Sequence, residues 1–259
     1  MKLLLLGMIQ FFKVILYQPI LNLLVWLYNI LPGHDLGVAI IIVTILIRAI
    51  LWPLSQKSVR SQKALQDLQP KLKVIQEKYK TDKQKQATAM MAIYRENKIN
   101  PLSSILPILI QLPILIAVYQ VFWKGIKATE LVLYPFIHNP GALNTMAFGF
   151  LDLSHRSIVL ALITGVVQYW QTKMLAKTTP PPTLAKKEGA KDENMMAMMN
   201  KQMNIMMPIF MVIIGITLPS GLLLYWLIGL FLTILQQKLV FKSADKKVIA
   251  KNYEERPKN

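Results

Sequence analysis

Residues 36–54 read LGVAIIIVTILIRAILWPL, a stretch whose only charged residue is Arg48. At about 1.5 Å per residue, a helix of this length reaches across a hydrocarbon core of roughly 30 Å. Residues 101–123 are equally apolar and contain no charge. The two stretches predict an all-α polytopic membrane protein.

Three further apolar stretches complete a predicted five-span core. They are residues 157–175, the shorter stretch 205–218, and residues 221–240. The last two are separated by helix-breaking residues around Pro219. They are therefore expected to form a tight hairpin of antiparallel helices.

The composition supports the membrane interpretation. The chain carries 30 Lys and Arg against 13 Asp and Glu, a formal charge of +17, yet 54% of its 259 residues are hydrophobic. Soluble nucleic-acid-binding proteins are basic but poorer in apolar residues, so this combination favours apolar spans joined by positive loops. The absence of cysteine excludes disulfides, thiol nucleophiles and Cys-ligated metals. No cofactor and no metal are expected.

The basic residues also predict the orientation of the chain. Segments 55–100, 176–204 and 238–259 hold 23 of the 30 basic residues, whereas residues 124–156 hold three. Positive loops stay in the cytoplasm, so the three basic segments and the C-terminus are expected there. Residues 124–156 then form an extracytoplasmic loop, and five spans place residues 1–35 on that outer side as well.

Residues 3–30 are apolar, but several polar or helix-breaking residues interrupt them. An amphipathic helix in the outer membrane interface, over roughly residues 16–31, explains this mixture better than a sixth span. A signal peptide is the alternative, since Lys2 precedes four leucines, although no clear cleavage site follows. The place of residues 1–15 is left open.

The basic segment 55–100 carries one narrow apolar stripe on each side of Thr81–Asp82. This pattern predicts a cytoplasmic helical hairpin that projects from the membrane. Eleven basic residues favour contact with anionic lipid, a nascent chain or a partner protein, and a solvated spacer is the alternative. The basic tail, residues 241–259, has no motif for sequence-specific nucleic acid binding.

The loop 176–204 begins with a polar, proline-containing stretch that is typical of flexible linkers. Residues 195–207 then hold seven of the fourteen methionines. Methionine side chains adapt to varied apolar partners, so this run could receive apolar segments of other proteins. The alternative is an amphipathic lead-in to the next span.

Arg48 is the most informative single residue. It lies about 9 Å deeper than the cytoplasmic end of its span, where an arginine costs up to about 3.5 kcal/mol on insertion scales. Its side chain could extend to the headgroups, or it could line a water-filled cavity open to the cytoplasm. No acidic residue lies in any predicted span, so an arginine in such a cavity is free to attract an anionic segment. Polar residues of the spans that could share the cavity are Thr44, Gln111, Gln168, Gln171, Thr217, Tyr225, Gln236 and Gln237.

An enzyme is not expected. The sequence lacks a Walker loop and the H-E-x-x-H and G-x-S-x-G motifs, and the predicted spans contain no Asp, Glu, His or Cys. A small-anion transporter or channel that uses Arg48 is one alternative function, although no internal repeat is visible. An assembly scaffold, based on the basic arms alone, is another.

Several short motifs, in this order, resemble the YidC family of membrane-protein insertases. They are GVAIIIVTILIR at 37–48, QP at 69–70, NPL at 100–102, LPILIQLPI at 106–114, LPSGLLLYW at 218–226 and QQ at 236–237. The resemblance covers about residues 15–240. It implies the five-span core, the cytoplasmic hairpin, the outer interfacial helix, and a hydrophilic groove open to the cytoplasm and to lipid.

The resemblance also implies a function. Such a protein receives hydrophobic segments of nascent membrane proteins in the groove and releases them into lipid, acting as an insertase and chaperone. Anionic lipids are further expected partners, and participation of the ribosome and the Sec translocon is left open. No transit peptide is evident, so the bacterial plasma membrane is the expected location.

Matching residues receive roles from the family. Arg48, Thr44, Gln111, Tyr225 and Trp226 correspond to the groove, and Pro113 and Ile114 to the surface along which a client slides. The polar residues Gln168 and Gln171 of the third span are added as groove candidates. The chain departs from the family at Leu230, where an asparagine is common near the aromatic pair.

Overall fold

The computed structural model describes residues 10–100, 106–125, 132–176 and 206–254. Nearly all of the predicted loop 176–204 lies outside these residues, as does most of its methionine run. Most of the open segment 1–15 also lies outside them. The remaining chain is mostly helical, which confirms the predicted fold class at that level.

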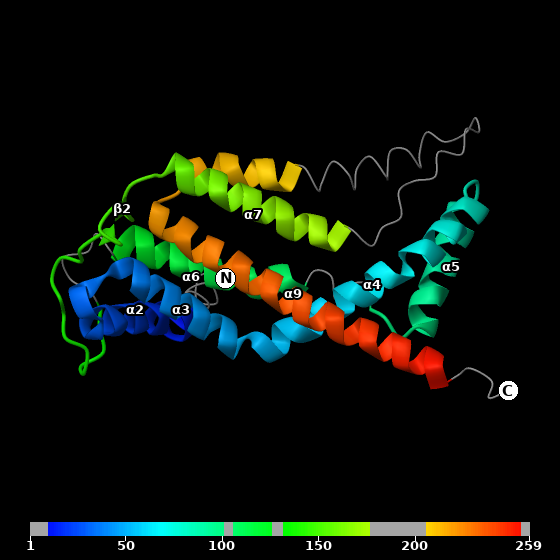
Figure 1. Ribbon diagram of the computed structural model, residues 1–259, viewed down its shortest axis with the longest axis horizontal. Coiled ribbons are helices and arrows are strands. Elements are labelled where there is room, and N and C mark those ends of the chain that lie inside the picture. Colours follow the sequence, from blue (N-terminus) through cyan, green and yellow to red (C-terminus); the bar gives the residue numbers. More distant parts are fainter. Residues whose placement is uncertain (1–9, 101–105, 126–131, 177–205, 255–259) are drawn as a thin grey trace. The chain divides into compact units, whose positions relative to one another are not determined.

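Figure 1 traces the helices in chain order. A π-helical turn, Lys13–Tyr17, leads into α2, Gln18–Ile30, and a short 3-10 turn, Pro32–His34, precedes α3. The longer helices are α3 (Leu36–Ile50), α4 (Trp52–Lys78), α5 (Lys83–Glu96), α6 (Leu106–Gln120), α7 (Ile158–Ala176), the helix Met206–Thr217, and α9 (Ser220–Glu254). A π-helical turn, Val121–Gly125, follows α6. The loop before α7 holds two short antiparallel strands, β1 (Met146–Ala147) and β2 (Leu151–Asp152).

The described helices give a smaller number of full-length spans than the sequence predicts. Gln10–Ile30 and Ser220–Ser243 are each long and apolar enough to cross a membrane, and a third span results if α3 and α4 count as one broken helix. Leu109–Trp123 and Met206–Thr217 are apolar but shorter. The five-span core therefore remains a prediction. Because Gln10–Ile30 has the length of a span, its expected place in the outer interface also remains a prediction.

Residues 36–54, predicted as one span, form two helices that meet at Leu51. Pro53 lies in the first turn of α4 and has no N–H, so it cannot donate a hydrogen bond to the carbonyl of Ala49. The continuous helical ladder of α3 is lost at this point. Proline in a first turn is well tolerated, which allows α4 to begin at Trp52.

The chain divides into two compact units. The first contains the chain up to Ile50, Ile108–Tyr169 and Met206–Leu232, and the second contains Leu51–Pro107, Trp170–Ile205 and the chain from Thr233. The candidate site and the loop between α6 and α7 both belong to the first unit.

The first unit has an apolar core between closely packed helices. Its buried side chains include Leu21, Val25, Leu36, Ile40, Val118, Val121, Leu222 and Leu223. Gly37 at the start of α3 shows how tight the packing is, because a Cβ there would lie 2.6 Å from the Cβ of Ala147 in β1. Only glycine allows this approach between the helix and the strand.

The loop between α6 and α7, residues 132–157, is fastened to the helices of the first unit by hydrogen bonds. The buried side chain of Asn22 in α2 accepts from the backbone N–H of Tyr134 at 2.6 Å. Asp35 accepts from the N–H of Val38 at 3.0 Å, which caps α3, and from the N–H of Phe148 at 2.6 Å. Asn22 interrupts an apolar pattern in the sequence, and the structure shows that its side chain provides this loop with a hydrogen-bond acceptor.

In the second unit, α4 and α5 contact each other and are joined by a turn at Tyr79–Asp82. The side-chain amide of Gln86 donates to the carbonyl of Gln76 at 3.0 Å, and Asp82 caps α5 by accepting from the N–H of Lys85. Leu68 and Leu72 of α4 are buried, whereas α5 buries none of its side chains. Projection of this pair of helices from the membrane into the cytoplasm remains a prediction.

Candidate functional site

The guanidinium of Arg48, in the last turn of α3, lies against α9. A Cβ built on Gly229 would stand 2.8 Å from Nη2 and 3.5 Å from Nε of Arg48. Because Gly229 has no side chain, the backbone of α9 can approach the charged group this closely. The arginine is half-buried and contacts protein at the end of an otherwise apolar helix.

One hydrogen-bond donor of Arg48 has no partner among the residues that the structure describes. Its Nε is buried and has no hydrogen-bond partner within the described ranges. Within the same ranges, no carboxylate forms an ion pair with it. A buried donor without a partner costs about 1–3 kcal/mol, and more when the group is charged. Such a cost is typical of groups kept for function rather than for stability.

Tyr225 and Gln111 complete the surroundings of this arginine. Tyr225 lies one helical turn before Gly229 on α9, is only 3% exposed, and is close enough to Arg48 for a direct electrostatic interaction. Its hydroxyl accepts a long hydrogen bond, 3.4 Å, from the amide of Gln111 in α6. Three helices, α3, α6 and α9, therefore contribute to one polar group. We call Arg48, Gln111, Tyr225 and Gly229 the arginine cluster.

The other predicted site residues have varied surroundings. Thr44 is completely buried one turn before Arg48, and its hydroxyl donates to the carbonyl of Ile40 at 2.7 Å. Trp226 and Pro113 are half-buried, whereas Ile114 is buried. Their contact with a client stays a prediction.

Gln168 and Gln171 both lie on α7, are half-buried and already have interaction partners. Gln168 belongs to the first unit and Gln171 to the second. Gly229 is not among the site residues predicted from the sequence, but it belongs to the cluster. Its position four residues after Tyr225, on the same face of a helix, was the available signal.

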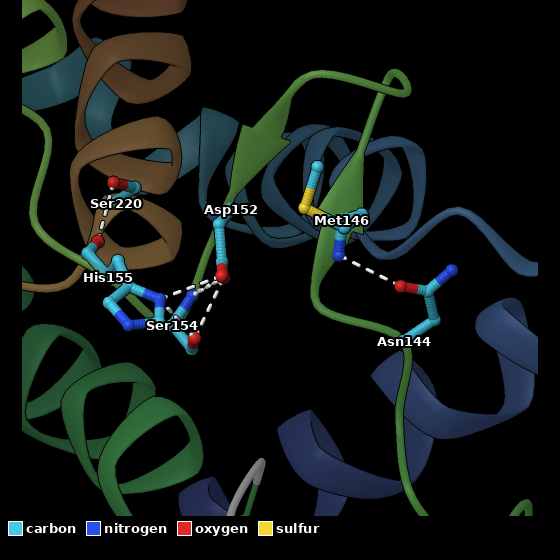
Figure 2. A network of polar contacts seen from close by, with 6 residues as sticks. All are labelled: Asn144, Met146, Asp152, Ser154, His155 and Ser220. Carbon is cyan, nitrogen blue, oxygen red and sulfur yellow. Dashed lines mark hydrogen bonds and ion pairs between the residues drawn. The ribbon is translucent and has the colours of Figure 1, made fainter.

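The loop between α6 and α7 contains a second polar network, drawn in Figure 2. Asp152 accepts hydrogen bonds from the N–H of Ser154 at 2.9 Å and from its hydroxyl at 2.7 Å, and its other oxygen lies 2.7 Å from Nδ1 of His155. The carbonyl of His155 accepts from both the N–H and the hydroxyl of Ser220. The network satisfies backbone groups at the start of α9, which would otherwise lack partners.

This network includes Asp, His and Ser, but its geometry differs from that of a catalytic triad. In a triad the imidazole joins the acid through one ring nitrogen and the serine through the other. Here the carboxylate and the hydroxyl of Ser154 both contact Nδ1 of His155, the hydroxyl at 3.1 Å. The arrangement cannot pass a proton from serine through the ring. Instead, the network includes the carbonyl of His155, which caps the start of α9.

The Asp152 network predicts a dependence of stability on pH. Although burial favours the protonated carboxyl, hydrogen bonds from Ser154, His155 and Thr145 hold the pKa of Asp152 well below its ordinary value. A depressed native pKa adds stability above the unfolded value of about 3.9 and loses it as the pH falls towards the native value. The melting temperature of the wild type should therefore exceed that of Asp152→Asn near neutral pH.

Thermal unfolding of both proteins in detergent, from about pH 6 downwards, measures this effect. The difference between them should begin to shrink below about pH 4. Acid effects of the other carboxyl groups are shared and cancel in the comparison. A difference that stays constant over this range would show that the Asp152 carboxylate does not stabilise the loop.

Comparison with known proteins adds independent information. The sequence model of the family described as 60Kd inner membrane protein matches residues 26–247. The membrane protein insertase YidC of Haemophilus influenzae (strain PittEE) is 36% identical over 229 residues, and that of Tolumonas auensis is 34% identical over 232. The corresponding protein of Pelobacter propionicus is 32% identical over 228 residues.

These alignments cover 86%, 89% and 88% of this chain, but 37%, 37% and 39% of the respective relatives. The chain thus spans less than half the length of the curated relatives that it matches. The matched region contains the whole arginine cluster.

Proposed function

The chain belongs to the 60Kd inner membrane protein family, and from that membership we propose that it is a membrane protein insertase. Its apolar helices and its relatives support a membrane protein of the bacterial inner membrane. The observation that carries the proposal within this chain is the arginine cluster, a cationic group among apolar helices whose buried Nε finds no hydrogen-bond partner in the described part of the chain.

The proposed first step is capture of a client's hydrophilic flank. A polar flank cannot enter hydrocarbon without losing its hydrogen bonds to water, which costs several kcal/mol per group. The guanidinium of Arg48 and the polar groups of Gln111 and Tyr225 offer replacement partners. An acidic flank gains most, because charge-assisted hydrogen bonds are about twice as strong as neutral ones.

The proposed second step is release of the client's apolar segment into lipid. The exposed apolar side chains Leu109, Leu112 and Ile116 of α6 would guide it, together with the half-buried Pro113, which precedes the buried Ile114. Transfer of apolar area out of water supplies roughly 25 cal/mol per Å², so no hydrolysis is needed. The cytoplasm-open groove in which both steps would occur, and the five-span core around it, are parts of this proposal.

A short apolar stretch of the sequence supports a shortened path for the client. Residues 205–218 are fewer than the roughly 20 apolar residues that a full span requires. A bilayer can become locally thinner around a short apolar segment at modest cost. A flank captured near Arg48 would then have less hydrocarbon to cross.

The positive-inside bias supports a cytoplasmic C-terminus and a cytoplasmic place for α4 and α5. In this orientation the α6–α7 loop faces the outside. Nascent membrane proteins are the proposed clients, and the basic residues of α4 and α5 suit contact with anionic lipid.

Reconstitution of the purified chain tests the proposed function. A ribosome-released client with an acidic flank should become protease-protected in proteoliposomes that contain the chain, and not in protein-free liposomes. A photo-crosslinker in place of Gln111 should capture the client during insertion. The same crosslinker at Val159, an exposed position of α7, serves as the matched control.

The same vesicles discriminate the alternative. A small-anion transporter would release chloride or an anionic dye trapped inside the vesicles, without affecting client insertion. Client insertion with no anion flux supports the insertase. Anion flux that depends on Arg48, combined with insertion no better than in protein-free liposomes, would overturn it.

A further inference from the structure

The α6–α7 loop exposes aromatic side chains to an unusual extent. Phe136 and Phe150 are each 78% exposed, and each has an aromatic neighbour in the loop. The rings of Tyr134 and Phe136 have centroids 5.6 Å apart, and those of Phe148 and Phe150 are 6.1 Å apart. We call these four residues the aromatic pairs. The hydrophobic effect opposes leaving such rings in water.

The loop is held firmly, so the exposure does not come from a loose segment. Asn22 bonds the N–H of Tyr134, and the side chain of Asn29 donates to the carbonyl of His138 at 2.7 Å. Asp35 accepts from the N–H of Phe148. The first pair is therefore fixed beside α2, and the second beside the start of α3.

The position of these attachments indicates the depth of the aromatic pairs. Asn29 lies in the last turn of α2, and Asp35 immediately precedes α3. The helices α2 and α3 are both apolar and are joined by the short segment 31–35, which is expected to lie at one boundary of the hydrocarbon layer. Side chains fixed at that boundary lie at the level of the lipid headgroups, where aromatic residues are enriched.

The charge of the loop favours lipid over a protein partner. Residues 132–151 contain no Lys, Arg, Asp or Glu, although 17% of the chain is charged. A docking surface for a protein normally has an apolar centre with a polar, often charged, rim. The absence of charge instead matches a segment lying in the membrane interface, and α2, to which the loop is bonded, also exposes the apolar side chains of Trp26 and Ile30.

We propose that the aromatic pairs insert into the headgroup region of the outer leaflet and make the α6–α7 loop a lipid anchor, separate from the predicted interfacial helix. The loop also binds the start of α9, through His155 and Ser220 and through Leu153 and Gly221. Anchoring the loop therefore fixes the depth of α9, which carries Tyr225 and Gly229. The anchor needs only membrane embedding and is independent of client insertion.

The chain contains no cysteine, so single labels can be placed without background. Phe150→Cys and Phe136→Cys would each carry an environment-sensitive NBD fluorophore, in vesicles of the zwitterionic lipids phosphatidylethanolamine and phosphatidylcholine at high lipid-to-protein ratio. Each variant removes one ring of one pair and leaves the other pair intact. Ala87→Cys, at an exposed position of α5, is the control for a label in water.

Both loop labels should lose most of their fluorescence with lipids that carry a nitroxide at the headgroup or the first acyl carbons, and little with aqueous iodide. The Ala87 label should respond in the opposite way. Quenching of both loop labels by iodide alone would show that the aromatic pairs lie in water. Protection from both quenchers would show that protein covers them. Either result overturns the anchor.

This test is made in client-free vesicles. Failure of the insertase proposal would therefore leave its outcome unchanged, and failure of the anchor would leave the insertase proposal standing. A melting temperature close to that of the wild type in detergent verifies that each labelled variant is folded.

Discussion

Arg48→Ala is expected to lower the insertion rate of clients with an acidic flank by about tenfold or more. Hydrogen bonds to a charged group contribute about 1.5–3 kcal/mol, and each 1.4 kcal/mol corresponds to a factor of ten in rate. Clients with a neutral flank should lose far less, because they gain less from the guanidinium. Protease protection in proteoliposomes, measured over time for a matched pair of clients, gives both rates.

The stability of Arg48→Ala, in contrast to its insertion rate, is not expected to fall. Nε of Arg48 is buried without a partner within the described ranges, so removing the side chain also removes an uncompensated group. The melting temperature of Arg48→Ala in detergent should equal or exceed that of the wild type. Active sites commonly sacrifice stability in this way.

Arg48→Lys provides the matched control for charge. It keeps a cation at the position but lacks the planar fork of the guanidinium, so it should retain part of the preference for acidic flanks. An equal loss for acidic and neutral clients in Arg48→Ala would contradict electrostatic capture. A large fall in melting temperature would instead assign Arg48 a structural role.

Gly229→Ala is expected to reproduce much of the Arg48→Ala defect without changing any charged residue. The new Cβ would lie 2.8 Å from Nη2 of Arg48, closer than van der Waals contact allows. The end of a flexible side chain can move, so the fold should persist while the guanidinium is displaced. Alanine is also a better helix former than glycine by about 0.5–1 kcal/mol, so loss of helix stability would not explain the defect.

A double-mutant cycle tests this mechanism. In the Arg48→Ala background, Gly229→Ala should have no further effect on acidic clients, because the group that it displaces is absent. In the Arg48→Lys background its effect should be small, since lysine has no Nη2. Additive losses would contradict the mechanism and indicate a general packing defect.

Gly215→Ala is a suitable control for the added methyl group. Gly215 is also a buried helical glycine of the first unit, and a Cβ there would contact Ala161 at 3.1 Å and Leu223 at 3.2 Å, without touching Arg48. It tests whether crowding between helices by itself lowers insertion. A selective loss for acidic clients is expected only in Gly229→Ala.

The polar members of the arginine cluster can be recognised in the sequence, but their mutual contacts cannot. Arg48 stands out because one charge in a long apolar run is costly in lipid. Gln111 and Tyr225 stand out only as polar residues in apolar stretches, and their contacts with each other and with Arg48 require three helices to pack together. Gly229 has no functional group that would mark it in the sequence. Its role is to leave space for the guanidinium of Arg48, because glycine has no side chain.

The contacts of the α6–α7 loop also cannot be read from the sequence. Asn22 and Asp35 look like interruptions of apolar segments in the sequence, yet each binds a backbone N–H more than a hundred residues further along the chain. Similarly, residues 36–54 have the composition of one span, although the helix is interrupted at Leu51.

The helical membrane class and the isolation of Arg48 can be read from the sequence, because the cost of placing backbone and charge in hydrocarbon depends on composition along a single segment. The contacts of the guanidinium with Gly229 and Tyr225, and the attachment of the loop of exposed aromatic rings to the ends of α2 and α3, are known only from the packing of the folded chain. These contacts join residues far apart in the chain, and their formation depends on which helix faces meet and on the space left between them.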